Sequence, residues 1–109
     1  MKVKIEQYIR EDGSNPFEKW FDKLNALAAA KVATALYRME QGNFSNVESV
    51  GKGVYEYKIH LGPGYRIYFG QEDHDVVILV GGGSKKHQSS DIKKAKDLWA
   101  EYKTEKKRD

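Results

Sequence analysis

Basic and proton-carrying side chains are concentrated in a stretch that reads V-Y-E-Y-K-I-H-L and then, after two residues of turn, G-Y-R-I-Y-F. This stretch carries Lys58, His60, Arg66 and Tyr68. Lysine and arginine attract phosphate, a phenol can hydrogen-bond or stack on a base, and an imidazole can carry a proton near neutral pH. The combination suits the binding of a phosphodiester, with His60 as a candidate acid or base.

The alternation of this stretch predicts a β-hairpin with one polar and one apolar face. Strands over 54–61 and 65–70, joined by a tight turn at 62–64, place the polar side chains of both strands on one side of a sheet. A solvated sheet face with an ion pair between Glu56 and Arg66 is the alternative interpretation, and periodicity alone favours it. Periodicity by itself therefore does not establish a binding site.

A second basic segment, G-G-G-S-K-K-H, lies between a buried strand and the start of a helix. The N–H groups at a helix start attract anions, and Lys85, Lys86 and His87 add positive charge there. The segment does not match the P-loop pattern of glycines followed by Gly-Lys and Ser or Thr. Anion binding is favoured over a plain flexible connector, so Lys85 is a further candidate for phosphate binding.

The three histidines do not indicate a metal site. His60, His74 and His87 fall on a strand, a turn and a loop without the spacing of zinc ligands, and the chain contains no cysteine. No two carboxylates are brought together by periodicity in the manner of a glycosidase. We therefore expect neither a metal nor another cofactor.

The elements around the hairpin must form the sheet that positions these side chains. Residues 2–10 alternate with a period of two, which predicts a half-buried strand. Asn15 before a proline predicts one helix start, and Asn25 predicts a second, before an alanine-rich helix that stops at Gly42. The two helices are expected to form a hairpin, and the apolar strip of the second is expected to pack in the core rather than to dock a partner.

The remaining residues predict a loop, a central strand and a last helix. Residues 42–53 are expected to be a loop. Residues 76–80 are apolar on both faces and are expected to form a central strand, which ends at a hinge of three glycines at 81–83. A helix is expected from about Gln88 to Lys103, followed by a frayed tail at 104–109. The order β-α-α-β-β-β-α predicts one small α+β domain over 1–109, with a mainly antiparallel twisted sheet and helices against one face.

Length and charge limit the class of protein. A chain of 109 residues suffices for one domain, and no apolar window approaches the roughly 20 residues of a membrane span, so we expect a cytoplasmic protein. Residues 84–109 hold nine Lys and Arg against five Asp and Glu, so this end carries a net charge of +4, whereas the whole chain carries +3. Such a bias suits a polyanion or an acidic partner protein.

The chain resembles the RelE/ParE toxin superfamily, most specifically in G-P-G-Y-R-I-Y-F and G-G-G-S-K-K-H-Q-S-S-D-I-K-K-A. More narrowly, it resembles the HigB-like branch, the phage Gp49-like addiction module killer proteins. The resemblance covers nearly the whole chain and implies a RelE-like fold. It also implies a type II toxin that is neutralised by a cognate antitoxin, typically a small helix-turn-helix protein. Operator DNA is then bound only through the toxin–antitoxin complex.

The resemblance also implies an activity. RelE-like and HigB-like toxins enter the ribosomal A site and cut mRNA without a metal, by attack of the ribose 2′-hydroxyl on the adjacent phosphate. Arg66 matches the arginine that grips the scissile phosphate in the family. Lys58 and His60 match a basic pair on the preceding strand, while Lys86 and His87 approximate the basic and catalytic positions after the last strand.

Three points stay open at the level of sequence. RelE itself has a catalytic tyrosine near the terminal helix that S-S-D-I-K-K-A-K lacks, so Tyr68 or His87 is left as its substitute. A ParE-like inhibitor of DNA gyrase shares the fold but lacks nuclease residues, and the presence of Lys58, Arg66 and Lys86 argues against it. A module that binds RNA without cutting it, for example a phage accessory protein, is the third possibility.

Overall fold

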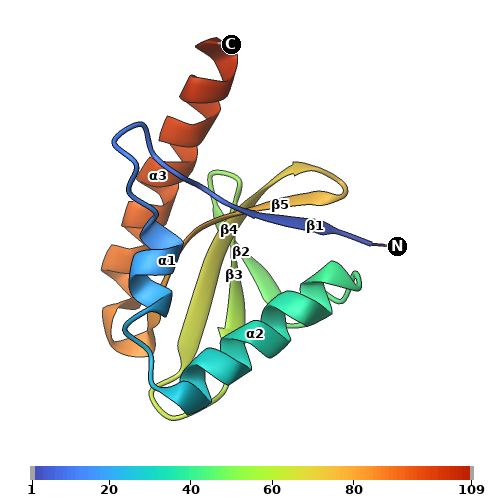
Figure 1. Cartoon of the computed structure of the whole chain (residues 1–109), viewed down its shortest axis with the longest axis vertical. Helices are drawn as coiled ribbons and strands as arrows, with labels where there is room; N and C mark the ends of the chain where they lie inside the picture. Colours follow the sequence, from blue (N-terminus) through green and yellow to red (C-terminus); the bar gives the residue numbers. More distant parts are fainter. Residues whose placement is uncertain (1, 109) are drawn as a thin grey trace.

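A five-stranded sheet in the order β1-β5-β4-β3-β2 forms the centre of the computed structural model, which describes residues 2–108 (Figure 1). β1 and β5 are parallel, and the other neighbouring strands are antiparallel. This arrangement confirms the predicted α+β class with a mainly antiparallel sheet. In chain order the elements are β1 (Lys4–Gln7), α1 (Pro16–Phe21), α2 (Ala26–Glu40), β2 (Val47–Gly51), β3 (Val54–Ile59), β4 (Tyr65–Asp73), β5 (Val76–Ser84), the 3₁₀ helix η1 (Lys85–His87) and α3 (Gln88–Arg108).

Both predicted helix starts are confirmed by side-chain caps. The Asn15 side chain accepts a hydrogen bond from the N–H of Glu18 at 3.0 Å, and Asn25 caps α2 in the same way at 2.9 Å. Each cap satisfies an N–H group that the first turn of a helix leaves unpaired. α2 ends at Glu40, just before Gly42, whose φ of 86° suits glycine and confirms the predicted stop.

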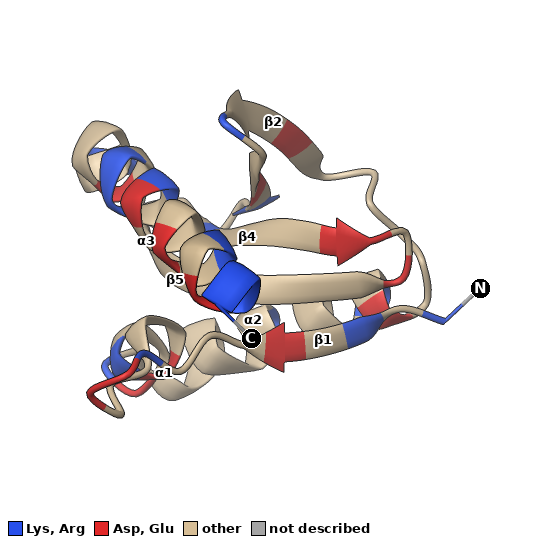
Figure 2. Ribbon diagram, turned by 90° about the horizontal axis from the view of Figure 1, so that it is seen from above, with Lys and Arg blue, Asp and Glu red and all other residues tan. Residues whose placement is uncertain are grey.

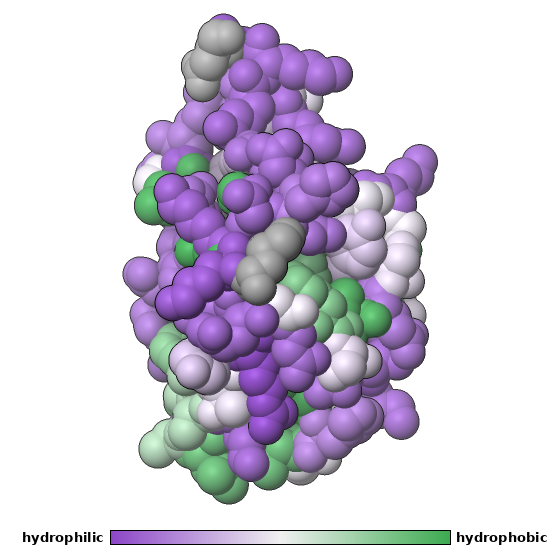
Figure 3. Space-filling view, turned by 90° about the vertical axis from the view of Figure 1, so that its right-hand side faces the viewer, coloured by the Kyte–Doolittle hydropathy of each residue, from purple (hydrophilic) through white to green (hydrophobic). Residues whose placement is uncertain are grey.

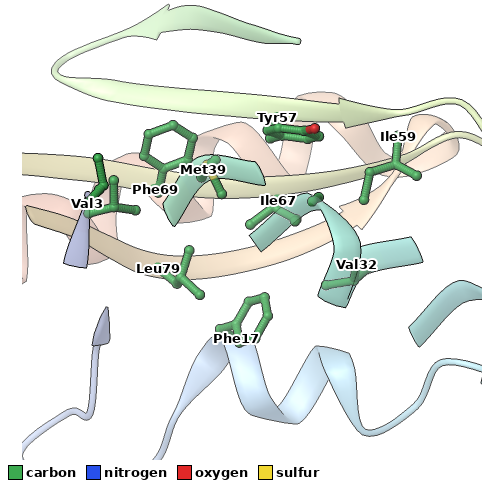
Figure 4. Packing of buried hydrophobic residues seen from close by; sticks show 11 residues of the cluster. Val3, Phe17, Val32, Met39, Tyr57, Ile59, Ile67, Phe69 and Leu79 are labelled. Carbon is green, nitrogen blue, oxygen red and sulfur yellow. The ribbon is translucent and has the colours of Figure 1, made fainter. Parts of the chain in front are cut away.

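Helices cover both faces of the sheet, which corrects the prediction of helices against one face. α1 and α2 pack on one face around a core that includes Phe17, Val32, Ile67 and Leu79 (Figure 4). α3 packs on the opposite face (Figure 2), in a second core that includes Val54, Tyr68, Ile78, Val80, Leu98 and Trp99. The prediction was wrong because the charged residues of the hairpin suggested a solvated face, which α3 covers in part.

An additional strand, β2, lies in the segment that the sequence predicted as a loop. Its register pairs Val47 with Tyr57 and Ser49 with Tyr55, so it forms the edge of the sheet beside β3. A short, half-exposed edge strand of five residues, V-E-S-V-G, carries a weak strand pattern, which explains why the sequence did not indicate it. The turn after it, Gly51-Lys52-Gly53, has positive φ at all three residues and reverses the chain into β3.

β5 continues through the three glycines to Ser84, which corrects the predicted hinge at 81–83. A Cβ on Gly82 would lie 2.2 Å from a ring atom of Trp20, and a Cβ on Gly83 would lie 1.9 Å from the carboxylate of Asp91. Side chains of α1 and α3 therefore approach the backbone of β5 where only glycine leaves room. These glycines serve close packing within a strand rather than flexibility between elements.

β3 ends at Ile59, so the hairpin loop holds residues 60–64 rather than the predicted turn at 62–64. Ile59 opposite Tyr65 is the last pair of the register. His60 therefore lies in the loop and is exposed, whereas the sequence placed it on the strand. β1 is also shorter than predicted and spans Lys4–Gln7 instead of 2–10.

α3 continues to Arg108, beyond the predicted end at Lys103 and into the segment predicted to fray. Its last turns are held against the body of the protein, since the Tyr8 hydroxyl lies within hydrogen-bond distance of both Glu101 and Glu105. Tyr102 and Lys106 likewise both contact Glu72 of β4. These tertiary contacts extend the helix past the point where propensity alone would end it. Asp109, the last residue of the predicted tail, lies outside the described residues.

Replacing Glu101 with glutamine is expected to lower the melting temperature by a few degrees at pH 7 and by less at pH 3. The Arg10 guanidinium donates two hydrogen bonds to Glu101, at 2.9 and 3.0 Å, and lowers the pKa of its carboxyl group. A lowered pKa contributes stability above the ordinary value of about 4.3, and this contribution is lost as the pH falls through the folded-state pKa.

Thermal unfolding of wild type and Glu101→Gln at the two pH values measures this difference. Glu6→Gln is the control, because Glu6 pairs with Lys4 on the surface at 3.0 Å, where ion pairs contribute little. An equal loss for Glu101→Gln at pH 7 and pH 3 would contradict a contribution from the ionised carboxylate.

The exterior on the face shown in Figure 3 is mostly hydrophilic, with smaller hydrophobic areas. Val32 and Met39 of α2 are buried, which confirms that the apolar strip of this helix packs in the core, while Leu27 and Tyr37 on the same helix are exposed. Within residues 2–108, no helix combines the length and apolar character that crossing a bilayer requires.

Candidate phosphate-binding site

A depression of about 490 Å³ at the loop end of the β3–β4 hairpin brings the two basic segments together. Its lining includes Lys58, His60 and Arg66 of the hairpin and Lys85 of η1. The N–H of Lys85 donates to the carbonyl of Gly64 at 2.8 Å, which ties η1 to the hairpin loop. Residues separated by more than twenty positions in the sequence therefore surround one basic hollow.

Arg66 is held in place from two sides. Arg66 is 8% exposed, and its Nη1 donates to the carbonyl of Gly64 at 3.0 Å. Its Nε lies 3.7 Å from Glu56 Oε1 but forms no hydrogen bond with a described residue. The register places Arg66 opposite Lys58, so the two cationic groups flank each other across the hairpin. A guanidinium fixed in this way presents its remaining edge to the depression with little loss of side-chain entropy.

Glu56 is a buried counterion that joins the members of this cluster. It is 3% exposed, lies 3.9 Å from the ammonium group of Lys58, and accepts hydrogen bonds from Gln88 at 3.1 and 3.3 Å. Lys58 also pairs with Glu48 of β2 at 3.1 Å. The ion pair of the alternative interpretation is therefore present at 3.7 Å, in a buried rather than a solvated setting.

Sequence reasoning missed the roles of Glu48 and Gln88 in this cluster. Glu48 lies in the unpredicted strand β2, so its proximity to Lys58 had no signal in the sequence. Gln88 stands in the quoted motif K-K-H-Q, directly after the basic residues, and its amide reaches Glu56 from the first turn of α3. The position of Gln in that motif was the available signal.

Tyr68 does not line the depression. It is 1% exposed beneath α3, and its hydroxyl finds no hydrogen-bond partner among the described residues. Burial raises the pKa of Tyr68, with smaller contributions from the charges of Glu56 and Asp91. The phenol therefore stays protonated at neutral pH and is suited to donate a hydrogen bond rather than to act as a base.

Lys86 and His87 lie on η1 and are exposed. Of the two, His87 is close enough to Asp91 to lower the pKa of that carboxyl group, which burial raises. His60 is the imidazole that the structure brings beside Lys58 and Arg66, since it lines the same depression. Between residues 2 and 108, no three His, Asp or Glu side chains gather in a group that would ligate a metal.

This arrangement is suited to binding a phosphate group. Lys58, Arg66 and Lys85 supply positive charge, and His60 adds an imidazole to the same lining. Glu56 lowers the net charge of the cluster but keeps two cations in fixed positions, which favours one geometry of the bound anion.

Comparison with known proteins places all of these residues in a matched region. A family model described as phage derived protein Gp49-like matches residues 19–101. An uncharacterized protein of Haemophilus influenzae is 42% identical over 83 residues, which cover 75% of this chain and 84% of that protein. No solved structure matches the chain. The chain therefore belongs to the phage Gp49-like family, the HigB-like branch of the RelE/ParE toxins.

Proposed function

We propose that this chain is the toxin of a type II toxin–antitoxin system and that it cleaves mRNA on the ribosome. The observation that carries the proposal is the meeting of Lys58, His60, Arg66 and Lys85 around one depression. Membership of a toxin family supports it. The proposed partners are a cognate antitoxin of helix-turn-helix type, the ribosome and mRNA, and the proposed compartment is the cytoplasm.

In the proposed reaction the ribose 2′-hydroxyl attacks the adjacent phosphorus, the 5′-oxygen of the next nucleotide leaves, and a 2′,3′-cyclic phosphate forms. Arg66 and Lys58 stabilise the negative charge that develops on the phosphate oxygens, and Lys85 binds the RNA backbone. His60, exposed beside them, takes up or supplies the proton. We assign a further phosphate contact to Lys86 and a second proton carrier to His87, both exposed on η1.

Cleavage of a defined mRNA on stalled ribosomes tests this function. We expect fragments that end in a 2′,3′-cyclic phosphate, and we expect a 2′-deoxy nucleotide at the cleaved position to abolish the reaction, because the attacking hydroxyl is then missing. The same deoxy substitution one nucleotide away is the matched control and should leave cleavage intact.

Inhibition of DNA supercoiling by gyrase, measured with the same protein preparation, distinguishes the second candidate. Blocked supercoiling without mRNA cleavage would overturn the endonuclease proposal in favour of a ParE-like gyrase inhibitor. Binding of RNA without either effect would favour a module that does not catalyse.

A further inference from the structure

A second hollow, the α1–α3 groove, lies between α1 and α3 over strands β4 and β5. It has a volume of about 310 Å³, and its lining shares no residue with that of the basic depression. Tyr68 and Gly81 belong to its floor, Trp20 and Leu98 to its walls. Volumes from about 300 Å³ with largely apolar walls and a few polar groups are typical of small-ligand sites.

One buried polar group in this groove lacks a partner, and a partly buried carboxylate lies near it. The Tyr68 hydroxyl is buried and has no hydrogen-bond partner among the described residues. Asp91, partly buried beside it, has its pKa raised by desolvation. A buried hydroxyl without a hydrogen bond destabilises the fold, so its presence calls for a partner outside the described residues. A ligand with both a hydrogen-bond acceptor and a donor would satisfy the pair.

Gly81 leaves room for such a ligand. It stands opposite Tyr68 in the β4–β5 register, and a Cβ added to it would meet nothing within 4 Å. The next two glycines differ, since Trp20 covers Gly82 and Asp91 covers Gly83. Open space on the floor is therefore confined to the position beside the unpaired hydroxyl.

Three lysines at the groove give it a positive rim. Lys19 comes from α1, Lys23 from the turn that follows it and Lys94 from α3, and none of them forms an ion pair with a residue that the structure describes. They face a single carboxylate, Asp91. The ligand that fits these features carries a negative charge, a flat and partly apolar body, and an edge with both donors and acceptors.

We propose that the α1–α3 groove binds one unpaired nucleotide of RNA, with its base over Gly81 and its phosphate at the lysines; this inference rests on the proposed endonuclease function. A nucleobase edge offers an acceptor to Tyr68 and a donor to Asp91. A carboxylate of an acidic peptide offers acceptors alone and leaves Asp91 unpaired and repelled. Tyr68 lies two residues from Arg66 on β4, so the nucleotide belongs next to the one whose phosphate is cut.

Titration of the protein with nucleoside 5′-monophosphates, followed by the NMR signals of the Trp20 indole and the Gly81 amide, tests the site without ribosomes. We expect Gly81→Val, which fills the floor, to weaken binding by about tenfold or more. Tyr68→Phe, which removes only the hydroxyl, should weaken it by roughly fivefold, as the loss of one hydrogen bond implies. Thermal unfolding checks that both variants are folded. If Gly81→Val does not fold, the result for Tyr68→Phe alone decides the test.

Two competing ligands and one further variant complete the experiment. Inorganic phosphate or an acidic peptide that shifts the same signals with equal affinity would overturn the proposal, because the groove would then bind any anion or a partner protein. Glu6→Gln, at a residue that lines neither hollow, should bind nucleotide as wild type does. Loss of binding in Arg66→Ala but not in Gly81→Val would place the nucleotide in the depression and overturn the proposal. The protein could also bind nucleotide, lose this binding in Gly81→Val, and yet cleave no mRNA. That result would support the nucleotide site in the groove and refute the proposed endonuclease function.

Discussion

Replacing Arg66 with alanine is expected to lower mRNA cleavage on the ribosome by about 10²- to 10³-fold, the usual loss when one fixed charge stabiliser is removed from a transition state. Arg66 is the most buried cation of this lining, and Gly64 and Glu56 hold its guanidinium from two sides. A pre-positioned group needs no reorganisation when charge develops on the phosphate. Single-turnover cleavage rates of the two proteins measure the effect.

The same substitution also removes a partner of the buried Glu56. We expect the variant to melt at a lower temperature but to remain folded, because Gln88 and Lys58 still contact the carboxylate. Arg66→Lys is the matched control, because it keeps the positive charge but loses the paired N–H groups of the guanidinium. Its cleavage rate should fall between those of wild type and Arg66→Ala. An unfolded Arg66→Ala protein would show a structural role, and an unchanged rate in the folded variant would refute the assignment of Arg66 to phosphate.

Glu56 keeps the cations of the proposed catalytic site in fixed positions. Its carboxylate lies 3.7 Å from Arg66 and 3.9 Å from Lys58. This negative charge offsets the repulsion between the two cations in the free protein. A bound phosphate adds a second anion to the cluster and strengthens an arrangement that already exists. The cost of desolvating the ion pair is met during folding and not during the reaction.

Local signals in the sequence predicted most of the elements correctly. The Asn15 and Asn25 caps, the period-two alternation of the hairpin and the stop at Gly42 each arise from interactions within a few residues. Such signals do not depend on what packs against the element. The two basic segments of the depression were predicted as candidate phosphate binders from local signals too. Each carries its basic residues next to a turn or a helix start.

The errors concern what lies across the sheet. Glu56 and Tyr68 are covered by α3, a helix that begins at least twenty residues further along the chain. Alternation alone cannot distinguish a solvated face from one that a helix covers. β2 lacks a strong pattern because it is an edge strand. The α1–α3 groove was missed because it is a property of space left between two helices, to which Gly81 contributes by the absence of a side chain.

Replacing Gly82 with alanine is expected to destabilise the protein by about 3 kcal/mol, the upper part of the range for inserting a methyl group into a packed core. The added Cβ would lie 2.2 Å from the Trp20 ring, which is too wide and rigid to turn aside in place. Trp20 also packs against Phe17, with ring centroids 5.8 Å apart, so α1 as a whole must move. Urea unfolding measures the change in the free energy of unfolding.

Gly81→Ala is the matched control one residue away in the same strand, because its Cβ enters open space and should leave stability unchanged. Equal stability of the two variants would refute the close packing of α1 on β5 and restore the interpretation of 81–83 as a flexible connector. The displacement of Trp20 has a second consequence, since that residue is a wall of the α1–α3 groove. Gly82→Ala should therefore also weaken nucleotide binding in the groove.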